Sequence, residues 1–462
     1  MRKKISMIMA AVLSLSMLAG CGASNGEKKS ADGKITLEVG NWPDATRPES
    51  LEKNENWKKQ FEELNQNITI TPNTYSYEVK TFIAKAAARQ LPDLLQNLPF
   101  TEVKKVAKNK YAAEITNAAK NAGVFEAIDP DILQMCTDEN GKLYTVPRSA
   151  YMQGIMINKN IFKKAGLVNP DGSVMVPETF DELAEFAVQI KEKTGVAGIT
   201  LPTTSNHGGW IFLNIAWNYG VNFVEQTEDG KWKATFDTPE FHKALEYVYD
   251  LKWNKNVLPD NKVIDASETQ MLLGSDSTGM IFGNSDWCSA LAQKAGMEPS
   301  NLAMAKIPAG PGGRYAQLGG SLFMFSPDLT EEQLDAGFKW IEFTGYGPVL
   351  NEDTYRDKCE LYANEGNFVF PKELFSIWKD EERSAKIEEI AASYANVDMK
   401  DYENYNQEGI ELRTEPAVCA QELYSVLDGV IQEILTNKGV DIKALSKKTQ
   451  DDFQVNHLDK MS

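Results

Sequence analysis

The spacing of apolar and polar residues predicts that the body of the chain opens as alternating strands and helices. Apolar residues alternate with polar ones over 35–39, and two further short apolar runs lie at 68–70 and 93–95. Between these runs, apolar positions recur with helical spacing over about 56–64 and 79–89. Strands that alternate with helices of about ten residues are typical of a parallel α/β sheet.

Capping residues predict where several later helices begin. The sequences TFDE at 179–182 and TEEQ at 330–333 have the spacing of a capping box, and Thr-Pro at 238–239 suits the start of another helix. An amphipathic segment at 423–435 predicts a helix near the end of the chain. The length of 462 residues exceeds one ordinary domain, but no linker-like segment divides the sequence. We therefore expect lobes that are joined by several crossings of the chain.

The charge balance excludes some partners. Asp and Glu outnumber Lys and Arg by 66 to 48, which gives a formal net charge of −18, and no basic stripe compensates for it. Such a surface repels phosphate backbones, so we expect no nucleic-acid binding. His207, His242 and His457 are far apart and lack metal-ligand spacing from each other or from a cysteine. We expect neither a bound metal nor a cofactor.

The first 33 residues predict export and attachment to a membrane. Residues 1–20 join a basic start to an apolar run at 5–18, which is too short to span ~30 Å of hydrocarbon and is typical of a signal peptide. The run ends in Leu-Ala-Gly-Cys21, which resembles the lipobox of bacterial lipoproteins and implies a lipid on the Cys21 thiol. A signal peptide with a chance cysteine is the alternative. Residues 22–33, which follow the expected lipid attachment site Cys21, carry no hydrophobic side chain larger than alanine, and we expect a flexible tether over 21–33.

Four further cysteines leave the disulfide pattern open. Cys136, Cys288, Cys359 and Cys419 are too few for a disulfide scaffold in a chain of this length. Their even number permits two bridges, but the pairing cannot be read from the sequence. Buried free thiols are an equally good interpretation.

Several motifs in the middle of the chain resemble one family. GKLYTVP at 141–147 is followed by GIMINKNIFKKAGL at 154–167 and by PETFDEL at 177–183. These motifs resemble the extracellular solute-binding proteins of ABC importers, and more narrowly the carbohydrate-binding group that includes maltodextrin-binding protein. Ile157 departs from the pattern, because the family usually has tyrosine there. Further matches, in the family's order, lie at 279–287, 308–314, 319–321 and 430–439.

The resemblance implies a two-lobed α/β fold of the periplasmic-binding-protein type. Each lobe would be a mostly parallel sheet flanked by helices, and the lobes would be joined by a hinge of several crossings. The implied first lobe comprises 34–148 and 312–365, the second comprises 149–311 and 366–462, and the crossings lie near Pro147, Pro311 and Gly366.

The function that the resemblance implies is the capture of a solute without catalysis. An oligosaccharide would bind between the lobes of a monomer and pass to an ABC permease, whose ATPase is a separate chain because no Walker A sequence occurs here. The Cys21 lipid would hold the protein on the extracellular face of the cell membrane. Three alternatives stay open: a non-sugar solute such as a peptide, polyamine, metal or phosphosugar; a secreted glycosidase or lyase; and a sugar sensor.

Two tryptophans are candidate sugar contacts from the residues themselves. A sugar-binding site needs flat aromatic surfaces for C–H faces and polar groups for hydroxyls. Trp42 follows a predicted strand directly, at the end of the sheet where open α/β folds bind ligands. Trp210 follows Gly208 and Gly209, which allow close approach of backbone to a ligand. Packing in the core is the alternative for each.

The resemblance adds further candidates beside these two. Trp287 ends a predicted strand at the position where the family stacks a tryptophan on sugar. Tyr151 either contacts ligand or braces the hinge, and Arg413, near Glu415, either lines the second lobe or forms a surface salt bridge. The other tryptophans (Trp57, Trp217, Trp232, Trp253, Trp340 and Trp378) are assigned to packing. The full set of expected ligand contacts is Asn41, Trp42, Asp44, Gln96, Asn97, Tyr151, Trp210, Asp286, Trp287, Gly320, Ser321 and Arg413.

Overall fold

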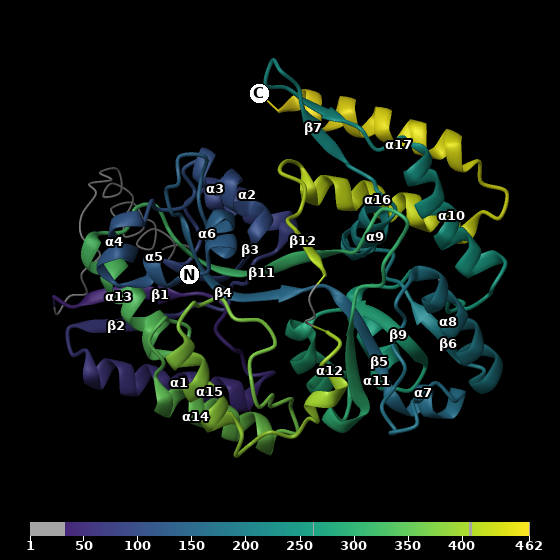
Figure 1. The fold of residues 1–462 in the computed structure, drawn as a ribbon. Coiled ribbons are helices and arrows are strands. Elements are labelled where there is room, and N and C mark those ends of the chain that lie inside the picture. Colours follow the sequence, from purple (N-terminus) through teal and green to yellow (C-terminus); the bar gives the residue numbers. More distant parts are fainter. Residues whose placement is uncertain (1–32, 262, 406–408, 462) are drawn as a thin grey trace, which may run out of the picture.

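Two sheets, each with its own hydrophobic core, organise the chain (Figure 1). The structure is a computed structural model that describes residues 33–461 except 262 and 406–408. The expected signal peptide, the Cys21 lipidation site and the tether up to residue 32 lie outside the described residues. The two-lobed α/β architecture that the sequence predicts is confirmed.

The first lobe surrounds a sheet with the strand order β12-β11-β3-β1-β2, in which β4 also pairs with β11. The strands β1, β2 and β3 are parallel, and β11 runs antiparallel to β3 and β4. The elements of this lobe are β1 (Ile35–Val39), α1 (Pro48–Leu64), β2 (Ile68–Pro72), α2 (Val79–Ala87), β3 (Leu94–Pro99), α3 (Val103–Lys108), α4 (Thr116–Asn121), α5 (Val124–Ala127), α6 (Pro130–Cys136), β4 (Thr145–Met152), β11 (Tyr315–Phe325), α13 (Glu331–Phe343), α14 (Glu352–Asn364), α15 (Glu381–Ala391) and β12 (Glu411–Arg413).

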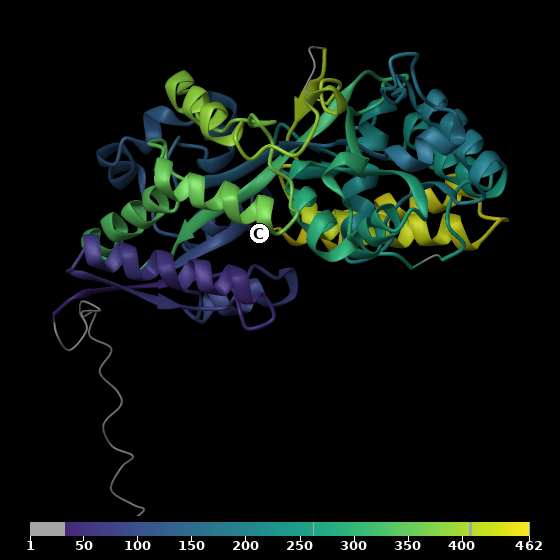
Figure 2. The same cartoon turned by 90° about the horizontal axis from the view of Figure 1, so that it is seen from below.

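The second lobe surrounds a sheet with the strand order β10-β5-β9-β6. In Figure 2 its C-terminal helices lie at the opposite side of the molecule from α1. The elements of this lobe are β5 (Gly154–Asn158), α7 (Lys159–Ala165), α8 (Phe180–Thr194), β6 (Ala197–Thr200), α9 (His207–Asn218), β7 (Val224–Gln226), β8 (Trp232–Ala234), α10 (Pro239–Trp253), α11 (Ala266–Gly274), β9 (Thr278–Gly283), α12 (Cys288–Ala295), β10 (Leu302–Lys306), α16 (Ala420–Thr436) and α17 (Ile442–Asn456).

One part of the fold prediction needs correction. The second sheet is not mostly parallel, because β5 runs antiparallel to both β9 and β10, and only β6 and β9 are parallel. The antiparallel direction of β5 follows from the way the chain crosses from β4 into the second lobe. β5 follows β4 after one residue and therefore enters the second lobe directly from the first, rather than through a helix that would reverse the chain.

Local capping signals place the helices well. The side chains of Thr330 and Gln333 both make the reciprocal bonds of a capping box at the start of α13. At α8 only half of the box forms, because Glu182 accepts from the Glu178 N–H while Thr179 accepts from the Glu182 N–H. The helix α1 begins at Pro48, eight residues before the predicted start, because proline suits the first turn of a helix.

The lobes meet where β4 and β11 cross side by side from one core to the other (Figure 1). Ala150 is buried in the first core, but Met152, two residues later, is buried in the second. On the paired strand, Leu318 belongs to the first core and Ala316 to the second. The chain therefore passes between the lobes around Tyr151.

The predicted lobe boundaries remain predictions. The two hydrophobic cores show how the chain passes between the lobes near Gly366, where the third crossing is expected. Phe368 is buried in the second core, whereas Trp378, ten residues later, is buried in the first. The chain therefore runs along the junction of the lobes over this segment instead of crossing at one point.

The four cysteines that the sequence left open are free thiols. Cys136, Cys288 and Cys359 are buried, and Cys419 is half-buried. Among the described helices, none is both long and apolar enough to cross a bilayer.

Candidate functional site

The two crossing strands form one wall of the candidate site. Ser149 and Tyr151 of β4 pair with Ser321 and Gly319 of β11. The hydroxyl oxygens of Ser149 and Ser321 are 2.9 Å apart. A Cβ atom on Gly319 would lie 2.7 Å from the Tyr151 ring, so only glycine leaves room for the ring at this position.

Three aromatic side chains gather beside this wall. The rings of Tyr151 and Trp210 meet edge to face with centroids 6.4 Å apart. Trp210 also lies 5.9 Å from Trp287, which belongs to a short 3-10 turn (Ser285–Trp287) directly after β9. All three side chains are only partly buried, so parts of their faces stay accessible. We call these residues the aromatic group.

Close packing of two helices positions Trp210 in this group. Gly209 lies so near α16 that a Cβ atom on it would be 2.3 Å from the Tyr424 carbonyl oxygen. The Asp428 carboxylate accepts hydrogen bonds from the backbone N–H groups of Asn206 and Gly209, and so ties the start of α9 to α16. The two glycines that the sequence analysis singled out therefore serve helix packing.

A carboxyl group with a raised pKa lies against the aromatic group. Glu415, in the loop before α16, accepts a hydrogen bond of 2.7 Å from the Tyr424 hydroxyl. Burial raises the pKa of Glu415 to about 7, although Tyr424, Gln317 and Trp210 oppose the shift by hydrogen bonding. A large fraction of this carboxyl is therefore protonated at neutral pH, when it can donate as well as accept a hydrogen bond.

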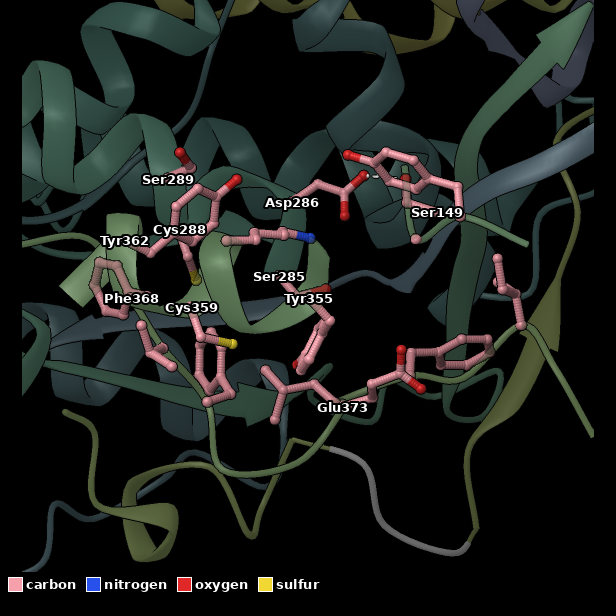
Figure 3. A pocket seen from close by; sticks show the side chains of 18 of the residues that line it. Ser149, Ser285, Asp286, Cys288, Ser289, Tyr355, Cys359, Tyr362, Phe368 and Glu373 are labelled. Atoms are coloured by element: carbon pink, nitrogen blue, oxygen red, sulfur yellow. Dashed lines mark hydrogen bonds between the residues drawn. The ribbon is translucent and has the colours of Figure 1, made fainter. Parts of the chain in front are cut away.

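A cavity of about 500 Å³ has walls from both lobes (Figure 3). Its lining includes Asp286, which directly precedes Trp287 in the sequence, but none of the three residues of the aromatic group. On the side of the second lobe, Asp286 points toward Ser149 and accepts a hydrogen bond of 2.7 Å from its hydroxyl. Burial by the surrounding walls raises the pKa of Asp286, while Ser149 and Arg148 oppose the shift. Asp286 and the adjacent Trp287 thus connect the cavity with the aromatic group.

Cationic side chains converge on one tyrosine in the first-lobe wall of the cavity. The Arg148 guanidinium donates a hydrogen bond of 3.0 Å to the Tyr346 hydroxyl, and the Lys358 ammonium is 5.5 Å from the centre of the same ring. Burial alone would raise the pKa of Tyr346, but Arg148, Lys358 and Lys53 lower it to about 8. The electrostatic potential in this part of the cavity is therefore positive.

The structure brings together about half of the predicted contacts. Gly320 lies within the crossing, where a Cβ atom would be 2.1 Å from the Ser149 carbonyl oxygen, so its role is close strand pairing. The predicted residues that line the cavity, belong to the aromatic group or lie on the crossing strands beside them are Tyr151, Trp210, Asp286, Trp287, Gly320 and Ser321.

Trp42, a leading candidate from the sequence, lies in the core of the first lobe. Its side chain is 2% exposed, its ring stacks 5.9 Å from Trp340, and its Nε1–H donates to Glu55. The position at the end of β1 is as predicted, but the ring turns inward toward α13 instead of toward the cavity. Packing, the alternative, describes this residue.

The other predicted contacts make local structural bonds. Asp44 is exposed and accepts from Thr46 within its own loop, while Asn41, beside it, adopts a positive φ and bonds Tyr75 through its backbone. Gln96 is buried and donates to the Gly40 carbonyl oxygen.

Asn97 and Arg413 are likewise engaged. The Asn97 side chain donates to the Ser76 hydroxyl and accepts from the Tyr77 N–H. The Arg413 guanidinium lies 3.3 Å from the Tyr315 ring centre and forms a surface ion pair with Glu411. The surface salt bridge considered for Arg413 is thus present.

Sequence reasoning missed the charged wall of the cavity. Arg148 directly follows the motif at 141–147, and Tyr355, Lys358 and Tyr362 all come from α14. Their spacing of three and four residues is that of a buried helix stripe, but tyrosine and lysine stand where aliphatic residues are usual. That anomaly was the available signal.

Within residues 33–461, gaps excepted, no cluster of three or more His, Cys, Asp or Glu side chains could hold a metal ion.

Comparison with known proteins identifies the family. The family described as bacterial extracellular solute-binding protein matches residues 45–349, more than half of the chain, so this chain belongs to it. A putative binding protein of Brucella abortus is 25% identical over 245 residues, which cover 50% of this chain and 56% of that protein. The multiple sugar-binding protein of Streptococcus mutans is 28% identical over 200 residues, which cover 41% and 42%. The matched part thus spans about half the length of these curated relatives.

Solved structures show the same fold. An ABC transporter solute-binding protein of Thermotoga lettingae, bound with α-D-tagatose, superposes with a TM-score of 0.68 at 19% identity, over 90% of this chain and 98% of that one. Members of the family bind solutes and are not enzymes.

Proposed function

We propose that this protein binds a carbohydrate, an oligosaccharide in particular, between its two lobes. The observation that carries this proposal is a cavity of about 500 Å³ with walls from both lobes, whose lining residue Asp286 directly precedes Trp287 of the partly exposed pair Trp210 and Trp287. Aromatic faces suit the C–H surfaces of sugar rings, while the Asp286 carboxylate and the hydroxyls of Ser149 and Ser321 suit sugar hydroxyls. The volume lies within the range of about 300–1,000 Å³ that is common for ligand pockets.

Two adjacent features support a ligand longer than one sugar. Asp286 lines the cavity and the adjacent Trp287 contacts Trp210, so one sugar ring would stack on a tryptophan while the next occupies the cavity. The names of the relatives support a carbohydrate ligand rather than its length, since one is a multiple sugar-binding protein and another was solved with tagatose, a monosaccharide.

We further propose that the bound sugar passes to an ABC permease with a separate ATPase. A ligand that touches both Lys358 of the first lobe and Trp287 of the second would stabilise the closed arrangement that a permease could recognise. We also propose that the protein is a monomer. We propose in addition that a lipid on Cys21 holds it on the extracellular face of the cell membrane, which the lipobox-like sequence before Cys21 supports.

Thermal unfolding against a panel of mono- and oligosaccharides tests the binding proposal. A ligand at about 100 times its dissociation constant stabilises the folded state by about 2.7 kcal/mol, which raises the midpoint by several degrees. Trp287→Ala should weaken binding about tenfold or more, because it removes a stacking surface. Trp232→Ala is the matched control, since this tryptophan lies on the β7–β8 hairpin. Equal binding by both variants, or a sugar shortened during incubation, would overturn the proposal.

A further inference from the structure

The cavity wall of the first lobe holds cations that lack carboxylate partners. Two cations of this wall are Arg148 and Lys358, and within the described chain no Asp or Glu oxygen lies within 4.0 Å of their charged nitrogens. The Arg148 Nε–H is buried and has no hydrogen-bond acceptor. A buried guanidinium donor without an acceptor is costly, so it points to an acceptor that the folded chain does not itself supply.

The carboxylates that line the cavity do not neutralise this wall. Glu373 already pairs with Arg383, with 3.3 Å between the charged atoms. Asp286 lies on the opposite wall, where it accepts from the Ser149 hydroxyl. Four cationic side chains (Arg148, Lys358, Lys372 and Arg383) line the cavity against these two carboxylates.

The excess of positive charge is local. The chain as a whole carries a formal charge of −18, so the cationic wall stands out against an acidic protein. Burial lowers the pKa of Lys358, and negative charge on the neighbouring phenols raises it, so a bound anion would likewise favour the charged ammonium. In a partly enclosed cavity such charges are screened less than at an open surface.

We propose that the cavity recognises an anionic substituent on the sugar, a carboxylate or a sulfate or phosphate ester, through Arg148 and Lys358. The inference rests on the proposed carbohydrate function and narrows its ligand class. The anion would accept from the Arg148 guanidinium and from the Lys358 ammonium, while the phenols of Tyr346, Tyr355 and Tyr362 would donate to its remaining oxygens. The aromatic group would hold an adjoining ring.

Calorimetric titration with matched sugars tests the inference. The probes are disaccharides of glucuronate, galacturonate and mannuronate, each beside its methyl ester and its carboxyl-reduced form, together with sulfated and phosphorylated disaccharides. The methyl ester keeps nearly all the atoms of the acid but removes its charge. We expect at least one acidic sugar to bind about tenfold or more tightly than its uncharged counterpart, and the class of that sugar identifies the anion.

Variants connect the preference with the wall. Lys358→Gln should lose about tenfold or more in affinity for the acidic sugar and leave affinity for the uncharged counterpart unchanged. Lys339→Gln, at an exposed position on α13 that pairs with Asp335, is the control and should bind like the original protein. Unchanged thermal midpoints without ligand would show that both variants fold.

The outcomes separate the two proposals. If uncharged sugars bind as well as acidic ones, or if Lys358→Gln weakens both equally, the inference is overturned while the carbohydrate function stands. If no sugar of either kind binds, both proposals are overturned.

Discussion

Replacement of Glu415 by glutamine should change how stability depends on pH. Burial raises the pKa of this carboxyl from 4.5 to about 7 in the folded protein. Between these pH values the unfolded chain releases the proton and the folded chain retains it. The free energy of unfolding contributed by Glu415 is therefore fully present below pH 4.5 and falls as pH rises toward 7.

The size of the effect follows from the same pKa difference. Each pH unit between 4.5 and about 7 corresponds to about 1.4 kcal/mol, so the loss amounts to at most about 4 kcal/mol above pH 7. Glutamine has nearly the same shape and can still accept the hydrogen bond from Tyr424, but it carries no charge at any pH. Glu415→Gln should therefore match the original protein near pH 4.5 and be more stable by at most about 4 kcal/mol near pH 8.

Urea unfolding at a series of pH values, followed by tryptophan fluorescence, measures this difference. Glu403→Gln, at an exposed position, is the control, and its stability should run parallel to that of the original protein. Parallel curves for Glu415→Gln as well would refute the reasoning, because they would show that Glu415 titrates alike in the folded and unfolded chains.

Three further substitutions test the core, the cavity and the sheet of the second lobe. Trp42→Ala should lower the free energy of unfolding by about 3–5 kcal/mol in urea unfolding, because it empties a core position, and should leave sugar affinity unchanged; lost affinity with unchanged stability would contradict this. The ultraviolet absorbance of tyrosinate should show one phenol that ionises at about pH 8, a step that Tyr346→Phe removes. In the original protein an acidic sugar should raise the pH at which this phenol ionises, because the negative charge of the sugar offsets Arg148 and Lys358 while the opposing effect of Asp286 remains. An ionisation pH that does not change when the sugar binds would contradict the anion site. Gly154→Ala should destabilise the protein by about 2 kcal/mol or more in thermal unfolding, since the new Cβ atom would lie 2.4 Å from the Ala305 carbonyl oxygen, and an unchanged midpoint would contradict this.

Local patterns predicted much of the fold because strands, caps and turns depend on residues that are near in sequence. The capping sequence at 330–333 marked the start of α13, and the apolar run at 35–39 became β1. The direction of β5 was not predicted, since it depends on the lobe from which the chain arrives. A sequence pattern shows that a strand exists, but not which strand lies beside it.

The candidate site was predicted where a single strand or loop presents its residues. Asp286 and Trp287, which a motif read along the chain singled out, lie three and four residues after the end of β9, and Asp286 lines the cavity. Trp42 follows β1 in the same way, but its ring meets Trp340, a residue nearly 300 positions later. Only the packing of α13 against β1 decides between core and cleft, and no local pattern contains that information.

If a ligand binds between the lobes as proposed, ligand binding and lobe closure are one event. Direct polar contacts between the lobes include the 3.3 Å bond from Gln421 of α16 to the Thr101 hydroxyl, a single neutral bond worth about 1 kcal/mol. A ligand that bridges Lys358 in one lobe and Trp287 in the other adds contacts that exist only while the lobes are together. The free energy of binding to the closed form is therefore more favourable than that to any open form by the contribution of the contacts with one lobe. The equilibrium between open and closed forms shifts toward the closed form by the same free energy. An uncharged sugar that left Lys358 unsatisfied would provide a smaller shift, so the charge of the ligand would govern closure as well as affinity.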